Sequence, residues 1–139
     1  MSSALFEPIA LRGVELPNRI VVSPMCQYGS EDGNASEWHT IHLGSLSMSG
    51  AGLLILEATG VEPRGRITPK CLGLWSDENE ASLGRVLDLC REYGSATLGI
   101  QLGHAGRKAS VRPPFEGGTP LEPDEGAWTT VAPSPIPFE

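Results

Sequence analysis

Residues 19–28 read RIVVSPMCQY, and this stretch decides the expected fold. Its first four residues form a short run rich in β-branched side chains, which predicts a buried strand. Pro24 has no backbone N–H to offer a neighbouring strand, so the strand ends there. The chain therefore leaves the sheet through Met25, Cys26 and Tyr28, an unusual group of side chains for a strand end.

Two later apolar runs end in a comparable way. Residues 53–59 (LLILEAT) lead into Gly60, and residues 96–101 (ATLGIQ) lead into the loop LGHAGRK. If the three strands are parallel neighbours, Cys26, Ala58 and Gln101 gather at one carboxyl edge of the sheet. Such edges are where α/β folds bind their ligands.

Two helical patterns separate these strands. Ser36 is a plausible N-cap for a helix that ends near Met48. Its expected apolar side consists of Trp38, Ile41, Leu46 and either Leu43 or Met48. Asp77, followed three residues later by Glu80, predicts the start of a second helix that ends before Gly94. Its expected apolar stripe consists of Leu83, Val86, Leu87, Cys90 and Tyr93.

The element order indicates an α/β fold. We expect a hairpin over residues 5–18, alternating parallel strands and helices over 19–108, and an extended loop over 109–139. Seven of the twelve prolines fall in that loop. The alternation is compatible with the N-terminal part of a single (β/α)₈ TIM barrel spanning 1–139. Because such a barrel needs five more strands, we expect these residues to be the first part of a longer protein. A Rossmann fold is less suitable, since no G-x-G-x-x-G follows the first strand.

Composition excludes several classes of function. The formal net charge of −7 argues against nucleic-acid binding and against anionic membranes, since both require basic surfaces. No apolar run approaches the roughly 20 residues of a membrane span. Three cysteines without a CxxC spacing indicate reduced thiols and a cytoplasmic location.

A series of motifs resembles the Old Yellow Enzyme family of FMN-dependent ene-reductases. The similarity is greatest to the bacterial branch with the YqjM-type NADPH dehydrogenases and xenobiotic reductase A. The motifs follow the family's order along nearly the whole chain: PNRI (17–20), SPMCQY (23–28), EA (57–58), GRI (65–67), GLWSD (73–77), QLGHAGRK (101–108) and APS (132–134).

The resemblance implies a TIM barrel that binds FMN at the carboxyl ends of its strands. NAD(P)H reduces the flavin, which then reduces the C=C bond of an α,β-unsaturated carbonyl substrate, an enone or enal. Parts of this site, including the substrate-clamping pair, the proton donor and the FMN phosphate site, would come from a C-terminal barrel portion beyond residue 139. The resemblance also suggests a homo-oligomer.

Individual site residues follow from the same resemblance. The flavin contacts would be Ser23, Pro24, Met25, Cys26, Ala58 and Gln101. Cys26 would lie near flavin N5 and O4, where a weak S–H donor can shift the reduction potential. Tyr28 would contact the substrate carbonyl, and with Cys26 it forms the catalytic pair of this segment. The alternatives are that Cys26 is a small buried hydrophobic residue, that Tyr28 only packs in its loop, and that Gln101 makes a structural hydrogen bond.

The remaining polar residues allow two interpretations. Arg107 or Lys108 could neutralise reduced flavin or a phosphate, or could hold their loop to Glu57 or another carboxylate. His39 and His42 share a helix face, which with His104 invites a metal site. We expect none, because no HExxH motif or carboxylate spacing accompanies them.

Two alternatives to an ene-reductase remain. The chain could be a catalytically silent fragment that binds only its complementary C-terminal part. It could also belong to a barrel relative of the dienoyl-CoA reductase type.

Overall fold

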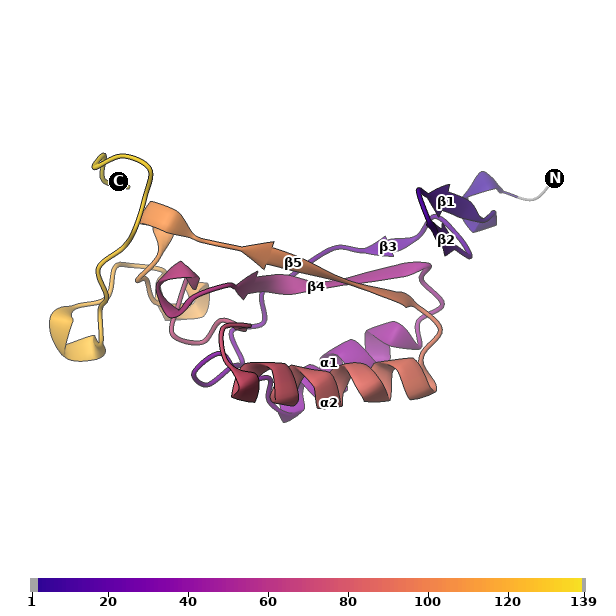
Figure 1. The fold of residues 1–139 in the computed structure, drawn as a ribbon, viewed down its shortest axis with the longest axis horizontal. Helices are drawn as coiled ribbons and strands as arrows, with labels where there is room; N and C mark the ends of the chain where they lie inside the picture. Colours follow the sequence, from indigo (N-terminus) through magenta and orange to yellow (C-terminus); the bar gives the residue numbers. More distant parts are fainter. Residues whose placement is uncertain (1–2, 139) are drawn as a thin grey trace.

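The computed structural model describes residues 3–138 as a three-stranded sheet with two helices, preceded by a hairpin and followed by a long loop (Figure 1). The strands are β1 (Ile9–Leu11), β2 (Val14–Leu16), β3 (Val21–Val22), β4 (Leu53–Gly60) and β5 (Thr97–Gly103). The helices are α1 (Glu37–Ser47) and α2 (Asp77–Tyr93). Short 3₁₀ turns lie at Ala4–Phe6, Pro63–Gly65, Gly106–Lys108, Pro114–Glu116 and Pro123–Glu125.

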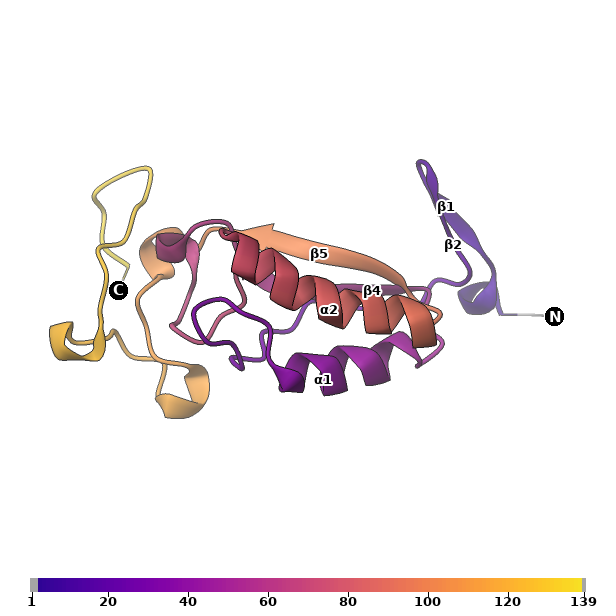
Figure 2. The same ribbon diagram turned by 60° about the horizontal axis from the view of Figure 1, so that its bottom comes forward.

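The central sheet is parallel, with the strand order β3-β4-β5. Strand β3, which corresponds to the strand expected over residues 19–22, is shorter than expected, because only Val21 and Val22 pair with β4. Both helices cover the same face of this sheet, as Figures 1 and 2 show from two sides. The N-terminal hairpin β1-β2 pairs separately and projects away from the sheet (Figure 2). The predicted order of strands and helices is confirmed.

The core lies between the sheet and the two helices. Leu54 and Leu56 of β4 are almost fully buried against Leu43 of α1 and against Leu83 and Val86 of α2. Each such side chain contributes about 1.5–3 kcal/mol when it leaves water. This single cluster therefore fixes how both helices lie on the strands.

Helix α1 begins after Ser36, as expected, but its predicted apolar side is wrong in part. Leu43 is buried and Leu46 is half-buried. Trp38, Ile41 and Met48 are exposed, Ile41 to 65%. The buried residues of the helix are His39, Leu43 and Ser47, spaced four residues apart on one face. Two polar side chains can lie there because each has a hydrogen-bond partner: Glu57 for His39 and the carbonyl of Gly44 for Ser47.

Helix α2 begins at Asp77, but its N-cap is Ser76, so the predicted capping box at Asp77 and Glu80 is wrong. The Ser76 hydroxyl accepts a 3.2 Å hydrogen bond from the backbone N–H of Asn79. The expected stripe is buried at Leu83, Val86 and Cys90, whereas Leu87 is half-buried and Tyr93 is exposed. Gly94 ends the helix at the point where α1 passes, since an added Cβ would collide with Ser47.

Strand β4 contains a bulge close to its carboxyl end. Leu56 pairs with Ile100, and the next pair is Ala58 with Gln101, so Glu57 is the extra residue. Side chains along a strand alternate between the two faces, and the bulge shifts this alternation by one residue. Glu57 therefore reaches His39 on the helix side, while Ala58 shares the opposite face with Gln101.

Candidate functional site

The residues expected at one carboxyl edge do come together. Ala58 and Gln101 are direct neighbours in the β4-β5 pairing, and the Cys26 thiol interacts with the backbone of Ala58. Ala58 and Gln101 also line a hollow of about 210 Å³, together with Gly103, Arg66 and His104 among others. The segment leading from β3 to this edge has Ser23 and Met25 exposed and Pro24 half-buried. The structure thus brings Cys26, Ala58 and Gln101 together toward the end of the sheet where α/β folds bind ligands, while residues 23–25 form the segment that leads there from β3.

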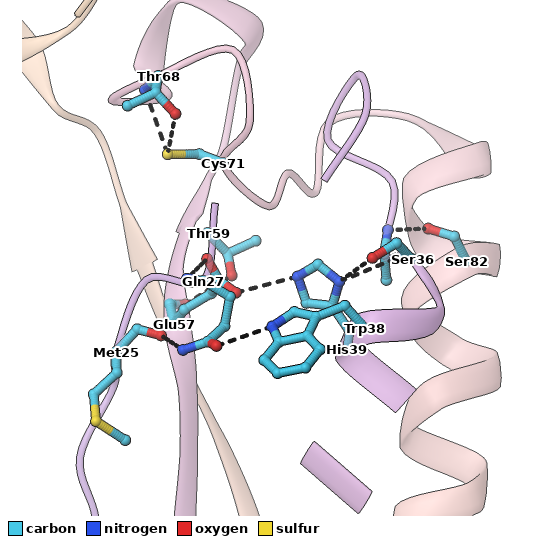
Figure 3. A network of polar contacts seen from close by, with 11 residues as sticks. Met25, Gln27, Ser36, Trp38, His39, Glu57, Thr59, Thr68, Cys71 and Ser82 are labelled. Carbon is cyan, nitrogen blue, oxygen red and sulfur yellow. Dashed lines mark hydrogen bonds and ion pairs between the residues drawn. The ribbon is translucent and has the colours of Figure 1, made fainter. Parts of the chain in front are cut away.

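A buried pair of hydrogen-bonded side chains, Glu57 and His39, holds the loop that carries Cys26 and Tyr28 (Figure 3). Glu57, 4% exposed, accepts a 3.0 Å hydrogen bond from the backbone N–H of Gln27 through one carboxylate oxygen. Its other oxygen lies 3.2 Å from Nε2 of His39, which is fully buried. His39 Nδ1 accepts the backbone N–H of Ser36, so Nε2 carries the proton donated to Glu57. Helix α1 and strand β4 therefore fix the loop backbone together.

Gln27 completes this anchor through its side chain. Its amide nitrogen donates to the carbonyl of Met25 at 2.8 Å, and its amide oxygen accepts from Trp38 Nε1 at 3.0 Å (Figure 3). Sequence reasoning missed both Gln27 and the pairing of Glu57 with His39. A signal was present, because a carboxylate inside the apolar run LLILEAT requires a buried partner.

Cys26 and Tyr28 remain protonated in this environment. Burial is the main cause that raises the pKa of the Cys26 thiol, and Cys71 and Glu57 add to it. Burial also raises the pKa of the Tyr28 phenol, with further contributions from Cys26 and Cys71. The two side chains interact with one another, which lowers the pKa of the thiol and raises that of the phenol. At neutral pH this pair offers an S–H and an O–H group rather than a nucleophilic thiolate.

The loop backbone is strained at Tyr28, whose φ is +51°. The left-handed region is unfavourable for a residue with a Cβ, and such strain persists only where the surroundings enforce it. The hydrogen bond from Gln27 to Glu57, one residue earlier, supplies part of that enforcement.

The basic residues after β5 do not pair with Glu57. Arg107 donates to the hydroxyl of Ser134 at 2.8 Å, and the Lys108 ammonium lies 5.1 Å from the ring centroid of Phe138. Both contacts tie the start of the long loop to its end. Within residues 3–138 neither side chain pairs with Glu57 or with another carboxylate, so the suggestion that either holds its loop to a carboxylate is wrong.

The three histidines lie in separate environments. His39 is paired with Glu57, and His42 stacks on Trp38 with 5.8 Å between ring centroids. His104 Nε2 lies 2.8 Å from Glu62, and this pair is about one-third exposed. Within residues 3–138, no group of three or more His, Cys, Asp or Glu side chains is arranged to hold a metal ion. No helix in the same range is long and apolar enough to cross a membrane.

Comparison with known proteins identifies the family of this chain. A model of the NADH:flavin oxidoreductase / NADH oxidase family matches residues 4–126. The chain belongs to this family. An NADPH dehydrogenase of Geobacillus thermodenitrificans is 44% identical over 140 residues, a match that covers 99% of this chain and 36% of that protein. The resemblance to the Old Yellow Enzyme family and its bacterial NADPH dehydrogenases is therefore confirmed.

Solved structures agree with this assignment. A morphinone reductase in complex with tetrahydroNAD superposes with a TM-score of 0.73 and 25% identity, covering 99% of this chain and 41% of that one. An Old Yellow Enzyme homologue from Zymomonas mobilis gives a TM-score of 0.69 and 28% identity, covering 77% and 30%. The expected fold, the N-terminal part of a TIM barrel, is confirmed. The chain spans 34–36% of the length of three curated relatives that it matches.

Proposed function

We propose that this chain forms one side of the flavin site of an FMN-dependent, NAD(P)H-consuming oxidoreductase. Its reaction would be the reduction of the activated C=C bond of α,β-unsaturated carbonyl compounds. The observation that supports this most strongly is the placement of Cys26, Ala58 and Gln101 at one carboxyl edge of the sheet. Family membership supports the class of reaction, and the residues at this edge are the ones that we propose take part in it.

The side chains at this edge fit a flavin ring. Gln101 is exposed, and within residues 3–138 no hydrogen bond occupies its amide. A free carboxamide offers both a donor and an acceptor, which suits the pyrimidine edge with its N–H and C=O groups. Ala58, its neighbour in the sheet, has the smallest side chain that is not glycine and lets a planar ring lie close.

When bound, FMN would supply the hydride transfer between NAD(P)H and the alkene. The chain's part is to hold and tune the group. The backbone of residues 23–25 would line the ring, and the Cys26 S–H would donate toward its N5 and O4 region. The raised pKa of Cys26 supports this role, because a donor must keep its proton at neutral pH.

Tyr28 is the proposed substrate contact. Its phenol also keeps its proton at neutral pH, since burial raises its pKa. A protonated phenol beside the flavin can donate a hydrogen bond to the carbonyl oxygen of an enone or enal. This bond polarises the alkene and orients it over the ring.

A complementary C-terminal portion would complete the site. The chain corresponds to about a third of its relatives, and the three parallel strands leave the outer edges of β3 and β5 without a neighbouring strand in residues 3–138. We propose that this portion pairs with those edges.

We also propose a cytoplasmic location for the protein. The three free cysteines agree with a reducing compartment such as the cytoplasm.

The test is reconstitution. The chain is mixed with the C-terminal part of the same protein, produced separately, and with FMN, and the mixture is separated by size. Co-elution of an oxidised-flavin absorbance band, bleached by NADPH and restored by 2-cyclohexenone, is the expected result. Absence of bound flavin from the mixture would refute the proposal.

A matched pair of variants makes the test specific. Gln101→Ala should raise the Kd for FMN about 5- to 30-fold, the effect of losing one or two hydrogen bonds. Thr97→Ala changes the same strand at its opposite end and should leave the Kd within twofold. Equal effects of the two variants would contradict a flavin contact at Gln101.

A further inference from the structure

The ring of Tyr28 has an aromatic neighbour from a distant part of the chain. Phe115, in the 3₁₀ turn Pro114–Glu116 of the long loop, meets Tyr28 edge to face, with ring centroids 6.1 Å apart and an interplanar angle of 75°. It is the only aromatic ring in contact with Tyr28 within residues 3–138. Aromatic pairs favour this geometry, since the positive edge of one ring meets the negative face of the other.

Phe115 is exposed to 67%, so hydrophobic burial does not explain its position. Lys70 holds it instead. The Lys70 ammonium lies 5.6 Å from the Phe115 ring centroid and 2.7 Å from a carboxylate oxygen of Glu116. One cation thus contacts two successive residues of the turn, which fixes the orientation of the turn.

Lys70 is itself tied to the loop of Tyr28. Its backbone carbonyl accepts a 3.1 Å hydrogen bond from the N–H of Ser30, two residues after Tyr28. The contacts therefore form a closed path from Tyr28 to Ser30, to Lys70, to Phe115 and back to Tyr28. A closed path of this kind restrains the tyrosine ring from outside its own loop.

We propose that Phe115 is a positioning residue for Tyr28 and thereby sets the affinity of the site for its carbonyl substrate. This inference rests on the proposed substrate contact of Tyr28. The phenol must present its hydroxyl in one direction to reach a substrate oxygen. Cys26 contacts the phenol through a side-chain hydrogen bond, and Phe115 is the aromatic contact that restrains rotation of the ring itself. Phe115 restricts that rotation without touching the reacting atoms.

The experiment uses the flavin-loaded protein that contains this chain and measures the two half-reactions separately. Phe115→Leu should raise the KM for 2-cyclohexenone about 2- to 10-fold, the range expected for losing one edge-to-face contact. Flavin reduction by NADPH and the flavin content should stay within twofold. Phe115→Trp keeps an aromatic ring at the same place and should restore the KM.

Two controls make the outcome decisive. Phe6→Leu is the same substitution at a similarly exposed phenylalanine, 64% against 67%, and should not change the KM. In a Tyr28→Ala background, Phe115→Leu should have no further effect, because the ring on which it acts is gone. An unchanged KM in Phe115→Leu, or a full effect that persists without the Tyr28 ring, would overturn the inference.

The same variants separate this inference from the proposed function. If Tyr28→Ala slows enone reduction but Phe115→Leu does not raise the KM, the inference alone fails. If Tyr28→Ala leaves enone reduction unchanged, the substrate role of Tyr28 fails, and the positioning role of Phe115 fails with it.

Discussion

Replacing Glu57 by glutamine should destabilise the chain far more than the same change at Glu62. Each carboxylate accepts a hydrogen bond from a histidine Nε2, at 3.2 Å for Glu57 and 2.8 Å for Glu62. The Glu57 pair is buried, with 4% exposure for Glu57 and 0% for His39, whereas the Glu62 pair is about one-third exposed. The two substitutions therefore change the same chemistry in different surroundings.

The magnitude follows from the hydrogen bonds of Glu57. Its two oxygens accept from Gln27 N–H and His39 Nε2–H, and glutamine has only one oxygen for these two donors. One buried donor must then face the new NH₂ group. An unsatisfied buried donor costs about 1–3 kcal/mol. At Glu62, water replaces the lost acceptor, and the free energy of unfolding should stay close to that of the unmodified chain.

Urea unfolding followed by tryptophan fluorescence measures the difference. With a slope of about 1–3 kcal/mol/M, a loss of about 2 kcal/mol lowers the midpoint of the Glu57→Gln chain by about 1 M. Trp38 reports the site directly, since its indole N–H bonds to Gln27. If Glu57→Gln and Glu62→Gln shifted the midpoint equally, the buried network would not hold the loop and the reasoning would be refuted.

Four further predictions concern the loop itself. Cys26→Ala should shift the flavin reduction potential while FMN stays bound, as measured by dye-coupled titration; an unchanged potential would return Cys26 to a structural role. Tyr28→Phe should slow flavin reoxidation by enones more than flavin reduction by NADPH in stopped-flow experiments, and equal effects would contradict a substrate contact. Because burial raises the pKa of Cys26, its alkylation by iodoacetamide at pH 8 should be slower than that of free cysteine. The raised pKa also means that the unfolded thiol ionises first, so stability should fall as the pH rises through the alkaline range, and a constant midpoint from pH 8 to 10 would speak against it.

The ends of β3 and β4 could be predicted to within one residue because their chemistry is local, whereas β5 runs two residues past the expected end at Gln101, to Gly103. Pro24 lacks the backbone N–H that a neighbouring strand would need, whatever the rest of the fold. Apolar runs separated by helical patterns imply parallel strands. The gathering of Cys26, Ala58 and Gln101 follows from that order alone. A register shift of one residue would still have left Ala58 and Gln101 at the same edge.

The hydrogen bonds of Glu57 with His39 and Gln27 could not be predicted, because they join residues that come together only in the folded chain. His39 and Glu57 lie 18 residues apart, and only the packing of α1 on β4 brings them together. The same packing explains the error over the apolar side of α1. The spacing of Trp38 and Ile41 in the sequence predicts an apolar helix face, but the sheet contacts the face with His39 and Leu43. A buried polar pair is invisible to hydrophobic periodicity.

The extra residue in β4 separates two tasks along one strand. Before it, alternate side chains serve the core through Leu54 and Leu56; after it, the alternation is inverted and Ala58 lies on the opposite face, the one proposed to contact the flavin. The facing of the side chains along β4 is therefore inverted between the residues that pack in the core and Ala58 on the opposite face. Glu57, the extra residue at this point, accepts the hydrogen bond that fixes the loop of residues 26–28. Deleting one residue here would turn every following side chain to the wrong face, a fault that no substitution elsewhere in the strand could repair.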